Sequence, residues 1–278
     1  MANKIAMATV SYAMAGIELD RSLRGIQDAG YEYIELSCIN LEPRIALLAH
    51  AQPERMSSSD IEALRKKISN YGLECICITG HVDLAGTPEA KDLLKKRIDL
   101  AESLGARYVN TGVGEATSEN NIKRFYKAMN EIADYCKRKD VIVALETLEH
   151  LIGTGKMCVP VMKRIDSPFI RICYDPADVR FYHGVDPVKT RDLEEIVSCV
   201  ATFHVKDHKG GKGDYNFPPI GEGEIDFKYL FNVLGKSNYE GPYIAEIEFT
   251  GICEKGERSP ELIDEAAVAS LKNIRKLL

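Results

Sequence analysis

The chain has 278 residues, of which 45% are hydrophobic and 28% are charged, and its 36 basic and 42 acidic side chains give a formal net charge of −6. This composition excludes a collagen, a coiled coil and a disordered tail, because the apolar residues suffice to fill a core. A net negative charge gives no general attraction to a polyanion, so we expect neither nucleic acid nor an acidic membrane as a partner.

Short apolar segments of strand length alternate with longer amphipathic segments along the chain. Strands are predicted at Ile5–Thr9, Tyr33–Ser37, Glu74–Thr79, Tyr108–Thr111, Ile142–Glu146, Ile170–Asp175, Thr202–Val205 and Tyr243–Glu248. A helical pattern follows each strand, at Asp20–Asp28, Ser58–Tyr71, Glu89–Leu104, Glu119–Lys139, Met157–Ile165, Pro187–Ser198, Phe227–Gly235 and Pro260–Leu277. Because no Gly/Ser-rich linker separates these pairs, we predict an α/β fold with one domain over residues 1–278, a closed (β/α)₈ TIM barrel. A doubly wound parallel sheet is the alternative architecture.

The N-terminal segment and the cysteines favour the cytoplasm. Residues 1–10 lack the apolar core and the small-residue cleavage site of a signal peptide. No apolar run approaches the ~18 residues of a transmembrane helix, so no membrane association is expected. The 8 cysteines are scattered, mostly within apolar segments where a thiol behaves as a small hydrophobe. We therefore expect a cytoplasmic protein whose cysteines are reduced.

Metal-type ligands stand at the ends of the last four predicted strands. They are Glu146, Asp175, His204 and Glu246. The active site of such a barrel is built at the C-terminal ends of its strands, so barrel closure would bring these side chains to one rim. A single strand-end carboxylate is more often a helix cap or an ion-pair partner, but four ligand types at equivalent positions are hard to assign to chance. We predict one divalent cation there, and this oxygen and nitrogen set suits Mn²⁺, Mg²⁺, Co²⁺ or Zn²⁺.

Seven segments, spread from the second predicted strand to the eighth, resemble the xylose isomerase-like (β/α)₈ barrel superfamily of sugar isomerases and epimerases. They are Gly30–Ser37, Leu104–Asn110, Ala144–Glu146, Tyr174–Val179, His204–Asp207, Ile220–Asp226 and Ala245–Glu248. The resemblance implies that Glu146, Asp175, His204 and Glu246 are the metal ligands, with Mn²⁺ as the expected ion. In the D-tagatose 3-epimerase-like members, the glutamates that match Glu146 and Glu246 also exchange the substrate proton. Relatives are usually dimers or tetramers, so a homo-oligomer is expected.

That double role is chemically coherent. A cation on the carbonyl oxygen and the adjacent hydroxyl of a sugar stabilises the enediolate that forms when the carbon between them loses a proton. A glutamate on each face of that carbon can remove the proton on one side and return it on the other. We therefore predict a metal-dependent isomerase or epimerase of a small-molecule ketose or related carbonyl sugar, with Glu146 and Glu246 as catalytic residues.

Four further residues are candidates for substrate binding. Asp178 stands where the ketose 3-epimerases commonly have a histidine, so either a hydroxyl contact or the substrate itself differs. His81 and His150 follow strand ends, where each is a general base, a hydroxyl contact or a solvated loop residue. Lys206 lies two residues after His204. It either faces the pocket, where it could polarise a carbonyl or bind an anionic group, or it forms an ion pair at the surface.

Other residues near strand ends are ambiguous. Glu248 lies two residues beyond Glu246, hence on the same side of the strand, and could replace or assist it as a ligand. Glu35 and Asn110 are possible pocket-wall residues, with core or capping roles as the alternative.

Competing functions keep the barrel but change the chemistry. A lyase or dehydratase would use the same metal and base, but its enolate would expel a β-substituent from an oxo-sugar, oxo-glycoside or inositol derivative. A nuclease of the superfamily is disfavoured, because Asn216–Pro218 and Asp178 stand where its further metal ligands belong and the chain is acidic. A non-enzymatic barrel would be expected to lack one or more ligands, and all four are present.

Overall fold

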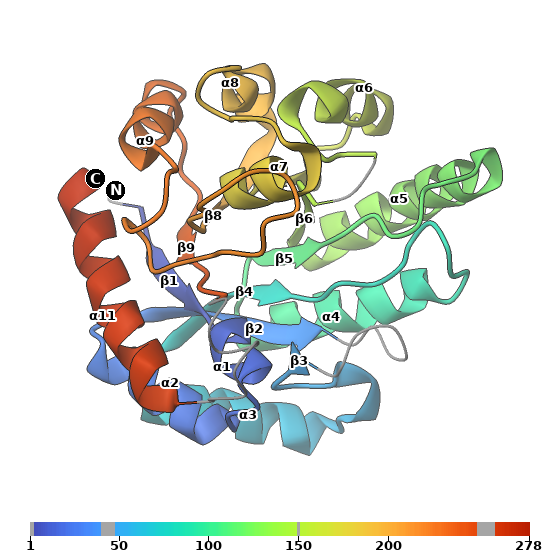
Figure 1. Cartoon of the computed structure of the whole chain (residues 1–278). Coiled ribbons are helices and arrows are strands. Elements are labelled where there is room, and N and C mark those ends of the chain that lie inside the picture. Colours follow the sequence, from blue (N-terminus) through green and yellow to red (C-terminus); the bar gives the residue numbers. More distant parts are fainter. Residues whose placement is uncertain (1–2, 40–47, 149–150, 249–258) are drawn as a thin grey trace.

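Eight parallel strands close into a barrel at the centre of the molecule (Figure 1). The structure is a computed structural model, and it describes residues 3–39, 48–148, 151–248 and 259–278. These strands are β1 (Ile5–Ala8), β2 (Tyr33–Ile39), β4 (Glu74–Thr79), β5 (Tyr108–Thr111), β6 (Ile142–Glu146), β7 (Ile170–Tyr174), β8 (Val200–Val205) and β9 (Tyr243–Ala245). Strand β1 pairs in parallel with both β2 and β9, which closes the ring. The predicted (β/α)₈ barrel is therefore confirmed, and the doubly wound sheet is wrong.

Helices surround the barrel (Figure 1). They are α1 (Val10–Met14), α2 (Leu19–Asp28), α3 (Ser58–Asn70), α4 (Ala90–Leu104), α5 (Glu119–Lys139), α6 (Gly155–Ile165), α7 (Pro176–His183), α8 (Asp192–Ile196), α9 (Phe227–Lys236) and α11 (Pro260–Leu277), with 3₁₀ turns at Pro53–Arg55 and Val197–Cys199. Local signals set several ends: Ser57 and Asp60 form a capping box before α3, and Gly105 ends α4 in the left-handed conformation. In the described part of the chain, no helix is both long and apolar enough to cross a membrane.

Several elements differ from the sequence prediction, among them the short helices α1 and α7, which were not predicted. A two-residue strand, β3 (Leu48–Ala49), pairs antiparallel with the end of β2 and was not predicted. The helix expected over Pro187–Ser198 is reduced to α8. The side chain of Asp186 accepts the backbone N–H groups of Val188 and Lys189 in a turn before α8, and Arg191 then adopts the left-handed conformation at φ 57°. Strand β9 stops at Ala245, since the N–H of Ile247 donates to the hydroxyl of Ser11 instead of a neighbouring strand.

The interior of the barrel combines small residues with buried polar ones. In the strand register Ala8 lies beside Glu35, Glu35 beside Cys77, and Asn110 beside Ala144. Residues paired in this way face the same side of a sheet. The small alanine and cysteine side chains leave volume inside the barrel for the larger polar groups, all of which are fully buried.

The cysteines are free, as expected. Seven lie in the described residues, none of these is in a disulfide, and six of the seven are buried. Cys253 lies outside the described residues.

Candidate active site

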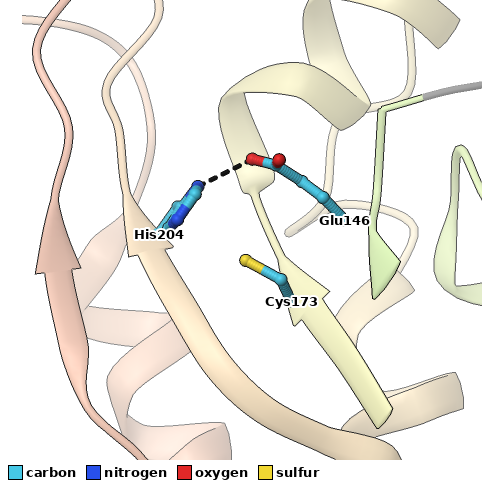
Figure 2. A group of neighbouring side chains, drawn as sticks. All are labelled: Glu146, Cys173 and His204. Atoms are coloured by element: carbon cyan, nitrogen blue, oxygen red, sulfur yellow. Dashed lines mark ion pairs between the residues drawn. The ribbon is translucent and has the colours of Figure 1, made fainter. Parts of the chain in front are cut away.

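Four of the predicted site residues meet around the imidazole of His204, which is fully buried near the C-terminal end of β8. Its Nδ1 atom lies 2.7 Å from Oε1 of Glu146, 3.2 Å from Oε2 of Glu246 and 3.7 Å from Oδ2 of Asp175. Figure 2 shows the Glu146 carboxylate pointing at His204, with the thiol of Cys173 beside them. Barrel closure thus brings all four predicted ligands to one place.

Three atoms of this cluster lack hydrogen bonds. Among the described residues, no hydrogen bond reaches Oε2 of Glu146, Oδ2 of Asp175 or Nδ1 of His204, although all three atoms are buried and have ion-pair contacts. A buried polar atom without a partner is costly, and such atoms gathered around one point are positioned to bind a ligand. Ligand atoms of Glu146, Asp175 and Asp178, and likewise of Glu35, His204 and Glu246, lie within 4.8 Å of one another. The donor set therefore fits a divalent cation.

The local charges also favour a cation. Burial by itself lowers the pKa of His204, but the acidic groups around it, with Cys173 and Glu35 first among them, raise that pKa well above its ordinary value. Burial raises the pKa of Glu246 well above the ordinary range, despite the nearby charges of Lys206 and His204. The carboxylates around His204 thus favour a positive charge at this point, which a divalent cation would supply.

Asp175 owes its position to the helix that follows it. Its Oδ1 atom accepts the backbone N–H groups of Ala177 and Asp178, at 2.8 and 3.0 Å, as the N-cap of α7. Pro176 occupies the first helical position, where no N–H is needed. The cap fixes one carboxylate oxygen and leaves Oδ2 directed at His204.

His81 holds the second oxygen of Glu146. It follows β4, and its Nε2 atom lies 2.9 Å from Oε2 of Glu146. The backbone N–H of Gly112 donates to Nδ1 of His81 at 2.9 Å. Because Nδ1 is an acceptor, Nε2 carries the proton that faces the carboxylate. His150, the other candidate histidine, lies outside the described residues.

Lys206 faces the site rather than the surface, and its side chain is 4% exposed. Its ammonium nitrogen lies 2.8 Å from Glu248, 3.0 Å from Asp178 and 3.2 Å from Glu246. The carboxylate of Asp175 follows at 3.7 Å, so four carboxylates surround a group that has three N–H donors. The ring of Phe217 packs against the same ammonium at 4.8 Å.

Glu246 and Glu248 have different neighbours. One oxygen of Glu246 faces His204 and the other faces Lys206. Glu248 instead contacts Lys206 and accepts a hydrogen bond of 3.1 Å from the hydroxyl of Tyr215. The contact with His204 therefore belongs to Glu246, while Glu248 contacts Lys206 and the carboxyl group of Glu246.

A polar layer lies beneath His204. Its members are Glu35, Cys77, Asn110 and Thr202. Glu35 and Asn110 were possible pocket-wall residues from the sequence, with core or capping roles as the alternative, whereas Cys77 and Thr202 were not assigned to this site. The carboxylate of Glu35 lies 3.3 Å from Nε2 of His204, on the opposite ring nitrogen from the ligand cluster. A signal was present, since Glu35 interrupts an apolar strand at an inward-facing position.

Comparisons with known proteins show the family of the chain and agree with its fold. The sequence model of a family described as xylose isomerase-like TIM barrel matches residues 23–274. The L-ribulose-5-phosphate 3-epimerase UlaE of Salmonella paratyphi B is 23% identical over 240 residues, which cover 81% of this chain and 80% of that protein. A D-allulose 3-epimerase from Methylomonas sp., solved in complex with D-allulose, has a TM-score of 0.73 at 17% identity and covers 100% of this chain and 98% of its own.

A metal-containing structure has the same architecture. A xylose isomerase-like TIM barrel protein from Mycobacterium smegmatis, in complex with magnesium, has a TM-score of 0.71 at 18% identity over 97% of this chain and 98% of its own. At these identities the two solved structures show a shared fold.

Proposed function

Because the chain belongs to the xylose isomerase-like TIM barrel family, we propose that it is a divalent-metal-dependent epimerase or isomerase of a ketose or related carbonyl sugar. The observation that carries the proposal is the convergence of three carboxylates on Nδ1 of His204, where that nitrogen and Oδ2 of Asp175 are buried and have no hydrogen bond from any residue that the structure describes. Relatives that are sugar epimerases support the same reaction class.

Glu146, Asp175, His204 and Glu246 would hold one divalent ion, with Mn²⁺ expected and Mg²⁺, Co²⁺ or Zn²⁺ as alternatives. When bound, such an ion polarises the carbonyl and an adjacent hydroxyl of the sugar and so stabilises the charge that develops when a proton leaves carbon.

The two glutamates perform the proton transfer. Glu146 ends β6 and Glu246 follows β9, and these strands are separated in the barrel by β7 and β8. Each carboxylate has one oxygen toward His204, while a group from another strand holds the second: His81 for Glu146 and Lys206 for Glu246. Two bases held in this way can remove a proton from one face of a carbon and return a proton to the other.

Asp178 and Lys206 act together at the edge of this site. Asp178 replaces the histidine expected of a ketose 3-epimerase, and it is bound to Lys206 at 3.0 Å. Since Lys206 donates hydrogen bonds to Asp178 and Glu248 and forms an ion pair with Glu246, we assign Lys206 to holding these three carboxylates in place. Contacts of His81 and Asp178 with substrate hydroxyls stay predictions.

Deuterium exchange tests the proposal. The Mn²⁺-loaded protein is incubated in D₂O with a ketose panel that includes D-allulose, D-tagatose, L-ribulose and L-ribulose 5-phosphate, and the products are analysed by mass spectrometry and NMR. An epimer that carries one deuterium beside the carbonyl, with an otherwise unchanged mass, is expected. A product lighter by water, or a released fragment without exchanged substrate, would refute the epimerase and favour the β-eliminating lyase.

A further inference from the structure

Glu35 is a carboxylate inside the barrel core. It lies on β2, is fully buried, and stands in register with Ala8 and Cys77 on the flanking strands. Interior positions of such barrels are ordinarily filled by apolar side chains. A buried carboxylate costs several kcal/mol unless it is paired and hydrogen-bonded, so its presence here calls for a specific partner.

That partner is His204. Within the described residues, His204 is the only basic side chain within 4.0 Å of the Glu35 carboxylate. The Nε2 atom of its ring lies 3.3 Å from Oε2 and 3.4 Å from Oε1 of Glu35. The imidazole therefore stands between Glu35 on one nitrogen and the ligand cluster on the other.

Neighbouring strands fix the orientation of Glu35. Asn110 on β5 donates from its amide nitrogen to Oε1 of Glu35 at 2.6 Å. The Asn110 amide is itself oriented by the hydroxyl of Thr202, which donates to its oxygen at 2.7 Å. The amide nitrogen also lies 3.1 Å from Nε2 of His204, and in the tautomer with a proton on Nε2, Glu35 is the acceptor that the amide and the ring share. Groups from β2, β5 and β8 thus form one connected layer.

We infer that Glu35 is a positioning residue for metal binding: its carboxylate accepts the proton on Nε2 of His204 and thereby keeps the lone pair of Nδ1 directed at the cation. The two nitrogens of a histidine are coupled in this sense, because a hydrogen bond on one fixes which nitrogen is free to coordinate. Without Glu35 the ring would lose both its restraint and its preferred tautomer. The inference rests on the proposed metal site, which supplies the reason for a free Nδ1.

Metal affinity tests the inference without measuring turnover. Chelator-treated full-length wild-type protein and the Glu35→Gln variant are titrated with Mn²⁺ by calorimetry. Loss of such an outer hydrogen bond should raise the Mn²⁺ dissociation constant by about 10–100-fold. Glu35→Asp keeps the negative charge but moves the carboxylate away from Nε2 of His204, so it should weaken Mn²⁺ binding as well. This variant replaces Glu35→Gln in the test if the glutamine variant does not fold.

Cys77→Ala is the matched control. It removes another contact of Glu35, the thiol that lies 3.1 Å from Oε1, but leaves the carboxylate next to His204. Its dissociation constant should stay within about threefold of the wild-type value, whatever its melting temperature. A spectroscopic signature accompanies the affinities: in the Mg²⁺-loaded wild type, ¹⁵N-histidine NMR should show a slowly exchanging proton on Nε2 of His204, and this signal should be lost in Glu35→Gln.

The outcomes separate the two proposals. If the wild type binds no divalent cation, the proposed metal site is refuted and the inference with it. If the wild type binds Mn²⁺ and both Glu35 variants bind it equally well, only the inference is overturned. Equal losses of affinity in the Glu35 variants and in Cys77→Ala would also overturn it, because the layer would then act through stability alone.

Discussion

The Nε2 atom of His81 lies 2.9 Å from one oxygen of Glu146, while the other oxygen of that carboxylate faces His204 at 2.7 Å. The Glu146 carboxylate is therefore held from both sides, by residues of β8 and of the loop after β4. A base fixed in this way needs little rearrangement before it accepts a proton from carbon.

Replacing His81 should impair turnover without removing the metal. In His81→Phe, Glu146 loses one of its two restraints, and misplacement of the base by about 1 Å lowers the rate on the order of 10²-fold. The four proposed ligands remain, so the Mn²⁺ dissociation constant should change little. Steady-state kinetics and calorimetry on one preparation provide both values. An unchanged kcat would show that the contact has no role in positioning.

Removal of either glutamate should abolish activity, whereas removal of their neighbour should not. Glu146→Gln and Glu246→Gln each lose a proton acceptor, which is worth about 10²–10⁴-fold in rate. Glu248→Gln is the control, since Glu248 contacts Lys206 and Tyr215 rather than His204. The kcat of each Mn²⁺-loaded variant is compared with wild type. An inactive Glu248→Gln beside an active Glu246→Gln would move the role by two residues.

Metal removal should reduce both activity and stability. Treatment with a chelator is expected to abolish turnover, and Mn²⁺ or Co²⁺ to restore it, because the ligand set combines oxygen donors with one imidazole nitrogen. A ligand that binds only the folded state at 100 times its dissociation constant stabilises by about 2.7 kcal/mol. Differential scanning calorimetry with and without Mn²⁺ measures the effect. Full activity of the metal-free protein would contradict the mechanism.

His50 should make the folded state less stable in acid. Its Nε2–H donates to the carbonyl of Ile17 at 2.8 Å, and its buried Nδ1 has no hydrogen-bond partner among the described residues. Burial lowers the pKa of His50 below its ordinary value of 6.5. As the pH falls below about 6.5, the unfolded chain binds a proton that the folded protein refuses, so the free energy of unfolding decreases.

The variant His50→Gln keeps a donor for the Ile17 carbonyl but cannot take up the proton. We expect the urea midpoint of the chelator-treated wild type to fall more between pH 7.5 and pH 5.5 than that of His50→Gln. Equal decreases in the two proteins would show that His50 does not contribute to the acid sensitivity.

Two glycines should respond oppositely to alanine. A Cβ atom on Gly241 would overlap the backbone carbonyl oxygen of Ala201 in β8, which cannot move without disturbing the barrel. Gly241→Ala should therefore destabilise the protein by about 1–3 kcal/mol. Gly235 lies in α9 with open space around its Cα, and Gly235→Ala should stabilise by up to about 1 kcal/mol. Urea unfolding compares both with wild type, and a neutral Gly241→Ala would contradict the packing.

Much of the fold could be predicted from neighbouring residues. The limits of β4, β5 and β6 and of α5 agree with the periodicity of the sequence, because alternation and helical spacing are properties of a few consecutive side chains. The α8 region was less predictable. The sequence pattern there suits a helix, but two features interrupt it. The side chain of Asp186 accepts a backbone N–H group, and Arg191 adopts the left-handed conformation.

The candidate site, too, could be predicted only in part from the sequence. The sequence by itself determined that Glu146, Asp175, His204 and Glu246 stand at or near strand ends, since each belongs to an apolar segment of recognisable strand length. Only the tertiary structure decided that Glu246 rather than Glu248 meets His204, that Lys206 binds three carboxylates, and that Glu35 lies beneath the imidazole. Glu35 and His204 are 169 residues apart, and their contact exists because eight strands close into one barrel. Barrel closure and strand register set such contacts, and no pattern within either segment encodes them.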